Sequence, residues 1–164
     1  MFEGLNILIK ILFICTHNRC RSILAEAVAK HVGAGKIIAA SAGSEPAGKI
    51  HPLTLEALKA AGVSVAGLRS KSWHELEDFA ADVVITVCDN AANETCPVWL
   101  GNTKKVHWGL ADPSALEGSG HSVMLAFQDT IDTLMSRLNK AVGMIERGID
   151  KAVVIDSLVT LTEN

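Results

Sequence analysis

The chain has 164 residues, of which 49% are hydrophobic and 20% charged, and its formal net charge is -3 at pH 7. This length predicts one domain that buries roughly two thirds of its unfolded surface. The composition excludes a disordered chain and the strongly basic surface of a nucleic-acid-binding protein. Apolar runs fall short of the ~20 residues of a membrane span and the start of the chain lacks a secretory pattern, so we expect a cytoplasmic protein that binds neither membrane nor nucleic acid.

Short apolar runs alternate with helical patterns along the chain. The runs predict strands at residues 7–14, 36–42, 82–88 and 104–110, and the helical patterns predict helices at 22–31, 52–62, 73–81 and 118–148. Ser72 is the expected N-cap of the third helix. Residues 149–164 fit a strand, a helical extension or a docking segment, and their pattern does not decide among these.

Strands that alternate with helices form parallel sheets covered on both faces. The sequence therefore predicts an α/β fold, an open doubly wound sheet of four parallel strands with helices on both faces. We expect a single domain over residues 1–164, with its core at about 7–148. Ligands of such sheets bind beyond the carboxyl ends of the strands.

The octapeptide CTHNRCRS, residues 15–22, connects the first predicted strand to the first predicted helix. A helix start favours anions, and neighbouring cations and the helix dipole lower the pKa of a cysteine from about 8.5 to about 3.5–7.5. We therefore predict that Cys15 is a thiolate nucleophile at neutral pH. Backbone N–H groups and the Arg21 side chain are expected to surround a tetrahedral oxyanion. The predicted oxyanion-binding residues are Thr16, His17, Asn18, Arg19, Cys20, Arg21 and Ser22.

The alternative for Cys15 is a buried, unreactive thiol at a strand end. The fixed offsets of Asn18, Arg21 and Ser22 favour the anion site instead. Asn18 suits a left-handed backbone turn, or an amide that ties the loop together. Ser22 suits a helix cap or a hydrogen-bond donor to the thiolate. For Cys20 we expect a packed side chain.

A Cys-x5-Arg-Ser loop with asparagine three residues after the cysteine resembles the low-molecular-weight protein tyrosine phosphatase superfamily. A second match is HWGLADPS, residues 107–114, because this superfamily carries its general acid in an Asp-Pro pair near the end of the domain. The resemblance assigns that role to Asp112, which would protonate the oxygen that leaves the attacked centre. An Asp-Pro pair alone is typical of a turn, so its meaning depends on the loop.

The segment VVITVCDNAANETCP, residues 83–97, places Cys88 at a strand end and Cys96 eight positions later. The carboxyl ends of parallel strands share one edge, so Cys88 is expected near Cys15. This cysteine pair resembles the thioredoxin-coupled arsenate reductases of the same superfamily, and the match covers most of residues 8–148. The resemblance implies that Cys15 attacks arsenate, that Cys88 attacks the adduct and releases arsenite, and that Cys96 then attacks Cys88.

The same resemblance implies arsenate as substrate, phosphate and sulfate as competing anions, and thioredoxin, or glutaredoxin with glutathione, as reductant. Thioredoxin is favoured, because a disulfide between Cys88 and Cys96 suits a dithiol protein. Two alternatives stay open: a phosphatase that hydrolyses phosphate monoesters through a phosphocysteine, and a protein that binds anions without chemistry. The chain contains no tyrosine and few aromatic residues, which disfavours a phosphotyrosine pocket. The cysteine spacing disfavours zinc.

No tightly bound cofactor is expected. In the low-molecular-weight reductases a potassium site uses residues that match Asn18, Glu26 and Ser41 of this sequence. Its fourth ligand has no obvious match here, so the resemblance allows a potassium ion without requiring one. His17 and Arg19 depart from the family pattern, in which glycine is frequent at the position of His17.

Overall fold

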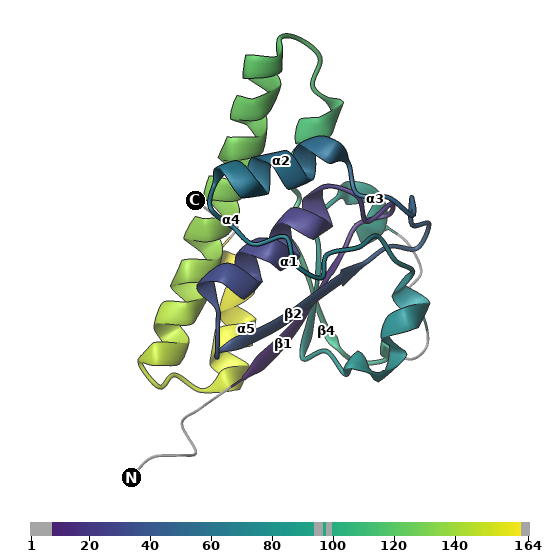
Figure 1. Ribbon diagram of the computed structural model, residues 1–164. Helices are drawn as coiled ribbons and strands as arrows, with labels where there is room; N and C mark the ends of the chain where they lie inside the picture. The colour runs from purple at the N-terminus through teal and green to yellow at the C-terminus, as the bar shows by residue number, and fades with distance from the viewer. Residues whose placement is uncertain (1–7, 94–96, 98–99, 162–164) are drawn as a thin grey trace.

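The computed structural model describes residues 8–93, 97 and 100–161 (Figure 1). Its four strands are β1 (Ile9–Ile14), β2 (Ile37–Ala42), β3 (Val83–Thr86) and β4 (Lys104–His107). All neighbours are parallel, in the order β2-β1-β3-β4. The predicted four-stranded parallel sheet is therefore confirmed.

The two central strands are buried along their length. Every residue of β3 is buried, and so is every residue of β1 except Lys10. Successive side chains of a strand point to opposite faces, so these unbroken runs mean that both faces of the sheet are covered. On one face, the ammonium group of Lys10 lies 5.1 Å from the ring centre of Phe79.

Four longer helices pack around the sheet: α1 (Arg21–Val32), α2 (Pro52–Ala60), α4 (Gly120–Glu146) and α5 (Lys151–Thr160). The long helix α4 lies beside α1, α2 and α5 (Figure 1). Its apolar stripe is fully buried, and each such side chain stabilises the fold by about 1.5–3 kcal/mol. The stripe includes Phe127, Ile131, Leu134 and Leu138.

The segment whose structure the sequence left open is the helix α5. Its side chains Val154 and Leu158 are buried in the core. The indole N–H of Trp108, just after β4, donates to the carbonyl of Leu158 at 2.9 Å. The last described residues therefore complete the core beside β4.

Short helical elements differ most from the sequence prediction. The helix predicted at 73–81 is a shorter 3-10 helix, η2 (Trp73–Phe79), which is interrupted at Leu76 (φ -110°, ψ 20°). Ser72 caps it as predicted and accepts a hydrogen bond from the His74 N–H. Two further elements were not predicted, α3 (Asp89–Ala92) and η4 (Pro113–Ala115). Elements of three or four residues are too short to show a period.

Among the described residues, no helix has the length and apolar character needed to cross a lipid bilayer.

Candidate active site

The loop that follows β1 lies at the carboxyl edge of the sheet, where the strands β2 and β3 also end. The Cys15 N–H donates to the carbonyl of Ala42 at 3.3 Å, and the Val87 N–H donates to the carbonyl of Ile14 at 3.0 Å. A pocket opens over this loop and is lined by Cys15, His17, Asn18, Arg19, Cys20, Arg21 and Asp112. The fold thus brings Asp112 next to the predicted oxyanion loop, although the two lie far apart in the sequence.

Asn18 organises the loop from inside. Its backbone is left-handed, with φ 46°, and it is fully buried. Its amide donates to the hydroxyls of Ser22 at 2.8 Å and Ser41 at 3.0 Å, and its carbonyl oxygen accepts from the Lys71 N–H at 2.9 Å. Both predicted roles of Asn18 are confirmed. The cap role predicted for Ser22 was wrong, because Cys20 is the N-cap of α1 and Ser22 lies in its first turn. Its role as a donor to the thiolate stays a prediction.

Arg21 and Asp112 face each other at the mouth of the pocket. Arg21 Nη1 donates to the carbonyl of Leu110 at 3.0 Å, and Nη2 lies 3.6 Å from Asp112 Oδ2. Asp112 Oδ1 accepts from the Ser114 N–H at 2.9 Å and from the Ser114 hydroxyl at 2.6 Å. The guanidinium that should hold an oxyanion thus contacts the carboxyl proposed as the acid. The role of Ser114 was not predicted, although an Asp-x-Ser turn signals it.

The thiols of Cys15 and Cys88 are hydrogen-bonded to each other, as the shared strand edge predicts. This bond lowers the pKa of Cys88 to about 5 against the effect of burial, with help from the N–H groups of Thr16 and Ala91. The same bond raises the pKa of Cys15; burial and the charge of Cys88 raise it further, and Arg21 only partly opposes them.

The predicted lowering of the Cys15 pKa is therefore wrong for this arrangement, in which the contact with Cys88 and burial raise that pKa. Within this pair the two shifts are opposite, because the pKa of Cys15 is raised and that of Cys88 is lowered to about 5. The physical reason is the contact between the two sulfurs, which a pattern around Cys15 alone does not reveal. One negative charge so close to Cys15 disfavours a second.

The remaining residues of the oxyanion loop differ in whether they line the pocket and in how far they are buried. Thr16 lies outside the pocket lining, with its hydroxyl 3.9 Å from Cys88 Sγ. Cys20 is buried as expected, and burial raises the pKa of its thiol to about 11.

The His17 ring is exposed and its Nδ1 is hydrogen-bonded to the carbonyl of Glu45 at 3.0 Å. The Arg19 carbonyl accepts from the Thr54 hydroxyl at 3.2 Å, which ties the loop to α2.

Cys88 directly precedes the short helix α3. The next residue, Asp89, is hydrogen-bonded through Oδ1 to His107 Nε2 at 2.9 Å, and His107 Nδ1 is hydrogen-bonded to the Thr86 hydroxyl at 2.8 Å. The side chain of Asp89 is 90% exposed and that of His107 39% exposed. The third predicted relay residue, Cys96, lies outside the described residues, so its position stays a prediction.

The three residues that match a potassium site do lie together. Ser41 donates to Glu26 Oε1 at 2.6 Å and accepts from Asn18. Glu26 also contacts two lysines: Lys30 Nζ donates to Oε2 at 2.5 Å, and Lys71 Nζ lies 3.8 Å from Oε1. Burial lowers the pKa of Lys71, and the charge of Glu26 opposes that shift. Sequence reasoning missed Lys71, which no motif marks.

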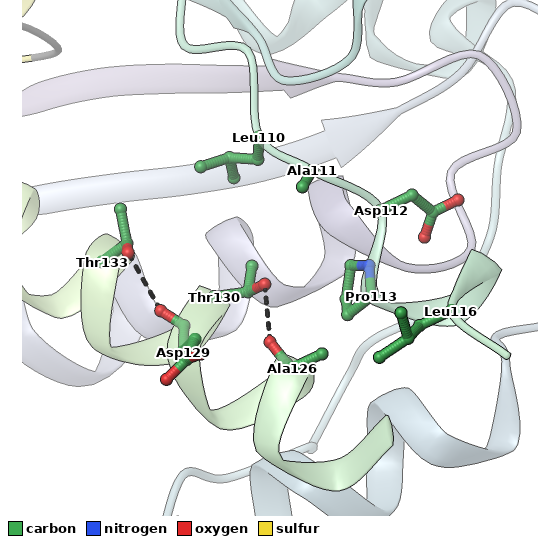
Figure 2. Close-up of a pocket in the computed structure, with 9 residues that line it drawn as sticks. All are labelled: Leu110, Ala111, Asp112, Pro113, Leu116, Ala126, Asp129, Thr130 and Thr133. Atoms are coloured by element: carbon green, nitrogen blue, oxygen red, sulfur yellow. Dashed lines mark hydrogen bonds between the residues drawn. The ribbon is translucent and has the colours of Figure 1, made fainter. Parts of the chain in front are cut away.

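A second pocket, of about 300 Å³, adjoins the first at Asp112 (Figure 2). One wall is the segment after β4, and the other is α4. The carboxyl group of Asp112 points away from the α4 side chains in Figure 2, in keeping with its contact to Arg21. This pocket is therefore adjacent to the oxyanion loop rather than part of it. The lining residues are Leu110, Ala111, Asp112, Pro113, Leu116, Ala126, Asp129, Thr130 and Thr133.

Comparison with known proteins gives one family and a consistent set of relatives. A family profile described as low molecular weight phosphotyrosine protein phosphatase matches residues 10–151. A protein of Shouchella clausii named arsenate reductase is 34% identical over 130 residues, which span 79% of this chain and 92% of the relative. A Synechocystis protein named glutaredoxin arsenate reductase is 36% identical over 104 residues, 63% of this chain and 78% of the relative.

Two solved structures of similar fold are likewise described as arsenate reductases. A structure described as an arsenate reductase in the phosphate binding state has a TM-score of 0.69 and 28% identity, and the match covers 84% of this chain and 98% of the other. A thioredoxin-dependent arsenate reductase of Corynebacterium glutamicum has a TM-score of 0.64 and 29% identity, with 86% and 63% covered.

Proposed function

The chain belongs to the low-molecular-weight phosphotyrosine protein phosphatase family, and from this premise we propose that it is an arsenate reductase. The observation that carries the proposal is the hydrogen bond between the thiols of Cys15 and Cys88 at the floor of an oxyanion loop. A phosphatase needs one nucleophilic thiol, whereas reduction of an arsenic adduct needs a second one within reach of the first. Relatives named arsenate reductase support the same choice.

The first step binds the substrate and forms a bond between sulfur and arsenic. Arsenate takes the place of the Asp112 carboxylate at the Arg21 guanidinium, since both anions match the same donors. Cys15 Sγ attacks arsenic, and one As–O bond breaks. The proton of the Cys15 thiol and the departing hydroxyl leave together as water, with Asp112 as the group that passes the proton.

The second step reduces arsenic. The Cys88 thiolate attacks Cys15 Sγ, and a disulfide forms between the two residues. The bond between sulfur and arsenic breaks with its electron pair left on arsenic, so As(V) becomes As(III) and leaves as arsenite. The lowered pKa of Cys88, about 5, keeps this attacking group ionised at neutral pH.

The last step passes the disulfide to the surface. Cys96 attacks Cys88, the Cys15 thiolate is released, and a disulfide joins Cys88 to Cys96. We propose thioredoxin as the reductant of that disulfide, because a dithiol protein reduces it without a further thiol. One relative is named for glutaredoxin and one solved structure for thioredoxin, so the test includes both. A reducing cytoplasm is the compartment that suits such a relay.

The test is arsenate turnover coupled to NADPH oxidation through thioredoxin and thioredoxin reductase, beside the glutaredoxin and glutathione system and beside hydrolysis of an aryl phosphate. We expect arsenite production with thioredoxin, lost in Cys15→Ser, Cys88→Ser and Cys96→Ser. Cys20→Ser is the matched control and should slow turnover less than about tenfold. Aryl phosphate hydrolysis that survives Cys88→Ser, without arsenate reduction, would overturn the proposal in favour of a phosphatase.

A further inference from the structure

The ammonium group of a buried lysine, Lys71, lies beside the three residues that match a potassium site, Asn18, Glu26 and Ser41. Glu26 is 2% exposed, the Lys71 side chain is 9% exposed, and Lys71 Nζ lies 3.8 Å from Glu26 Oε1. We propose that the Lys71 ammonium replaces a potassium ion, so that the oxyanion loop of this chain is organised without a monovalent metal. The inference rests on the proposed function only for the identity of the oxyanion that the loop binds.

The charge of Glu26 is connected to the loop through two hydrogen bonds. Glu26 Oε1 accepts from the Ser41 hydroxyl at 2.6 Å, and the same hydroxyl accepts from the Asn18 amide at 3.0 Å. A buried carboxylate needs a nearby positive charge, since its desolvation is costly. A group that neutralises Glu26 therefore also holds the Asn18 side chain, and with it the left-handed turn of the loop.

Lys71 contacts this network at both ends. Its backbone N–H donates to Asn18 Oδ1 at 2.9 Å, while its ammonium faces Glu26 and donates to the Arg69 carbonyl at 3.1 Å. Lys71 thus supplies both a buried positive charge beside Glu26 and a direct hydrogen bond to the loop asparagine. Lys71 is a positioning residue, because it acts on the oxyanion through Asn18.

The oxygen atoms that would bind a potassium ion already face protein donors. Asn18 Oδ1 accepts from the Lys71 N–H, Glu26 Oε2 accepts from Lys30 Nζ, and Glu26 Oε1 accepts from Ser41. A hard cation needs several free oxygen ligands. Within the part of the chain that the structure describes, these residues therefore do not fit a potassium ion.

The two lysines beside Glu26 differ in exposure. The side chain of Lys30 is 44% exposed and that of Lys71 is 9% exposed. Lys30 reaches Glu26 Oε2 from the surface, so water can take its place when it is shortened. Lys71 faces Glu26 Oε1 from inside the protein, so its removal takes a positive charge away from an oxygen that water reaches poorly. Lys30→Ala is therefore a matched control for Lys71→Ala.

The test measures phosphate affinity by calorimetry and the unfolding midpoint in potassium, sodium and choline chloride at equal ionic strength. We expect the wild-type protein to give values within about twofold in all three salts. Lys71→Ala should bind phosphate roughly tenfold more weakly in choline chloride, as expected for a lost buried contact. Potassium should restore most of that affinity and raise the midpoint, and Lys30→Ala should lose less than about twofold.

Two results would overturn the inference. One is wild-type protein whose phosphate affinity or midpoint rises specifically with potassium. The other is Lys71→Ala that shows the same loss in every salt, as a purely structural lysine would. Neither readout uses arsenate turnover, so failure of the proposed function is detected separately. If wild-type protein binds no phosphate, the midpoints decide.

A double variant keeps the test decisive if Lys71→Ala does not fold. Glu26→Gln combined with Lys71→Met removes both charges and leaves hydrogen-bonding capacity at residue 26. We expect it to fold, to bind phosphate and to be insensitive to potassium, whereas Glu26→Gln alone leaves the buried ammonium unpaired and lowers the midpoint. A double variant no more stable than its single variants would contradict the pairing of Glu26 with Lys71.

Discussion

The oxyanion loop and the segment that carries Cys88 are anchored very differently. In the loop, Asn18 and Ser22 are fully buried and hydrogen-bonded to each other. After Cys88, α3 has only four residues, and its contact to β4 runs through the Asp89 carboxylate, whose side chain is 90% exposed. One thiol is therefore presented on a rigid cradle and the other on a weakly anchored segment.

This difference matches the demands of the proposed relay. A disulfide requires two Cα atoms within about 4.4–6.8 Å, so Cys88 has to approach Cys15 and Cys96 in turn. The oxyanion loop has to keep its geometry during the same cycle, because donors must stay aimed at the substrate. Elements that move are those whose local opening costs little free energy.

The largest effect is expected at Cys15, the first residue of the oxyanion loop. Cys15→Ala should lower arsenate turnover by at least about 1000-fold, because it removes the thiol that forms the arsenic adduct. The same change removes the hydrogen bond that lowers the pKa of Cys88 to about 5 from its ordinary 9.0. Cys88 should therefore ionise at higher pH, and its thiolate fraction near neutral pH should fall.

Ultraviolet thiolate absorbance against pH measures this change in Cys88, with Cys20→Ser as the control that keeps the thiol pair. In wild-type protein the thiolate signal should appear as pH rises through about 5. An unchanged midpoint in Cys15→Ala would mean that the two thiols do not share a proton.

Asp112→Asn should separate turnover from binding. We expect turnover to fall roughly 100-fold, the size of a lost general acid. Phosphate affinity should stay equal or rise, because Arg21 Nη2 loses the carboxylate that lies 3.6 Å from it. Steady-state kinetics and calorimetry give the two quantities. Weaker phosphate binding with unchanged turnover would show that Asp112 positions the anion and does not act as the acid.

Asn18→Ala should destabilise the fold by about 3 kcal/mol, because it leaves buried partners unsatisfied and places a Cβ residue at φ 46° with no side-chain compensation. Asn18→Gly should cost less, because glycine tolerates a positive φ. Urea unfolding measures both. Equal losses for the two variants would assign the whole effect to the hydrogen bonds.

The smallest effect is expected at the exposed anchor of α3. Asp89→Ala should lower the free energy of unfolding by less than about 1 kcal/mol, the usual value of an exposed ion pair. It should nevertheless speed transfer of the disulfide from Cys15 to Cys96 about twofold, since α3 loses its contact with His107. Quenched-flow trapping of oxidised species measures the transfer, and His107→Gln is the companion variant. A loss of stability as large as that of Asn18→Ala would abolish the contrast between the two regions.

The parts of the fold that the sequence predicted are those with a local signal. The strands showed as short apolar runs, and α4 as a long apolar stripe ending near a glycine. The loop residues Cys15, Asn18 and Arg21 were found because their offsets along the chain are part of the chemistry. The short elements α3, η2 and η4 were missed or assigned the wrong helix type, because a few residues leave no period to detect.

The sequence by itself determined the order along the chain of the four strands and of the helices α1, α2 and α4, as well as the oxyanion loop and the candidate cysteines. Each of these depends on neighbours along the chain. Tertiary structure alone decided that the contact between Cys15 and Cys88 raises the pKa of one thiol and lowers that of the other, and that Lys71 lies against Glu26. Ionisation and charge pairing depend on distances between atoms and on burial, which residues far apart in the chain acquire only when the sheet and the helices pack together.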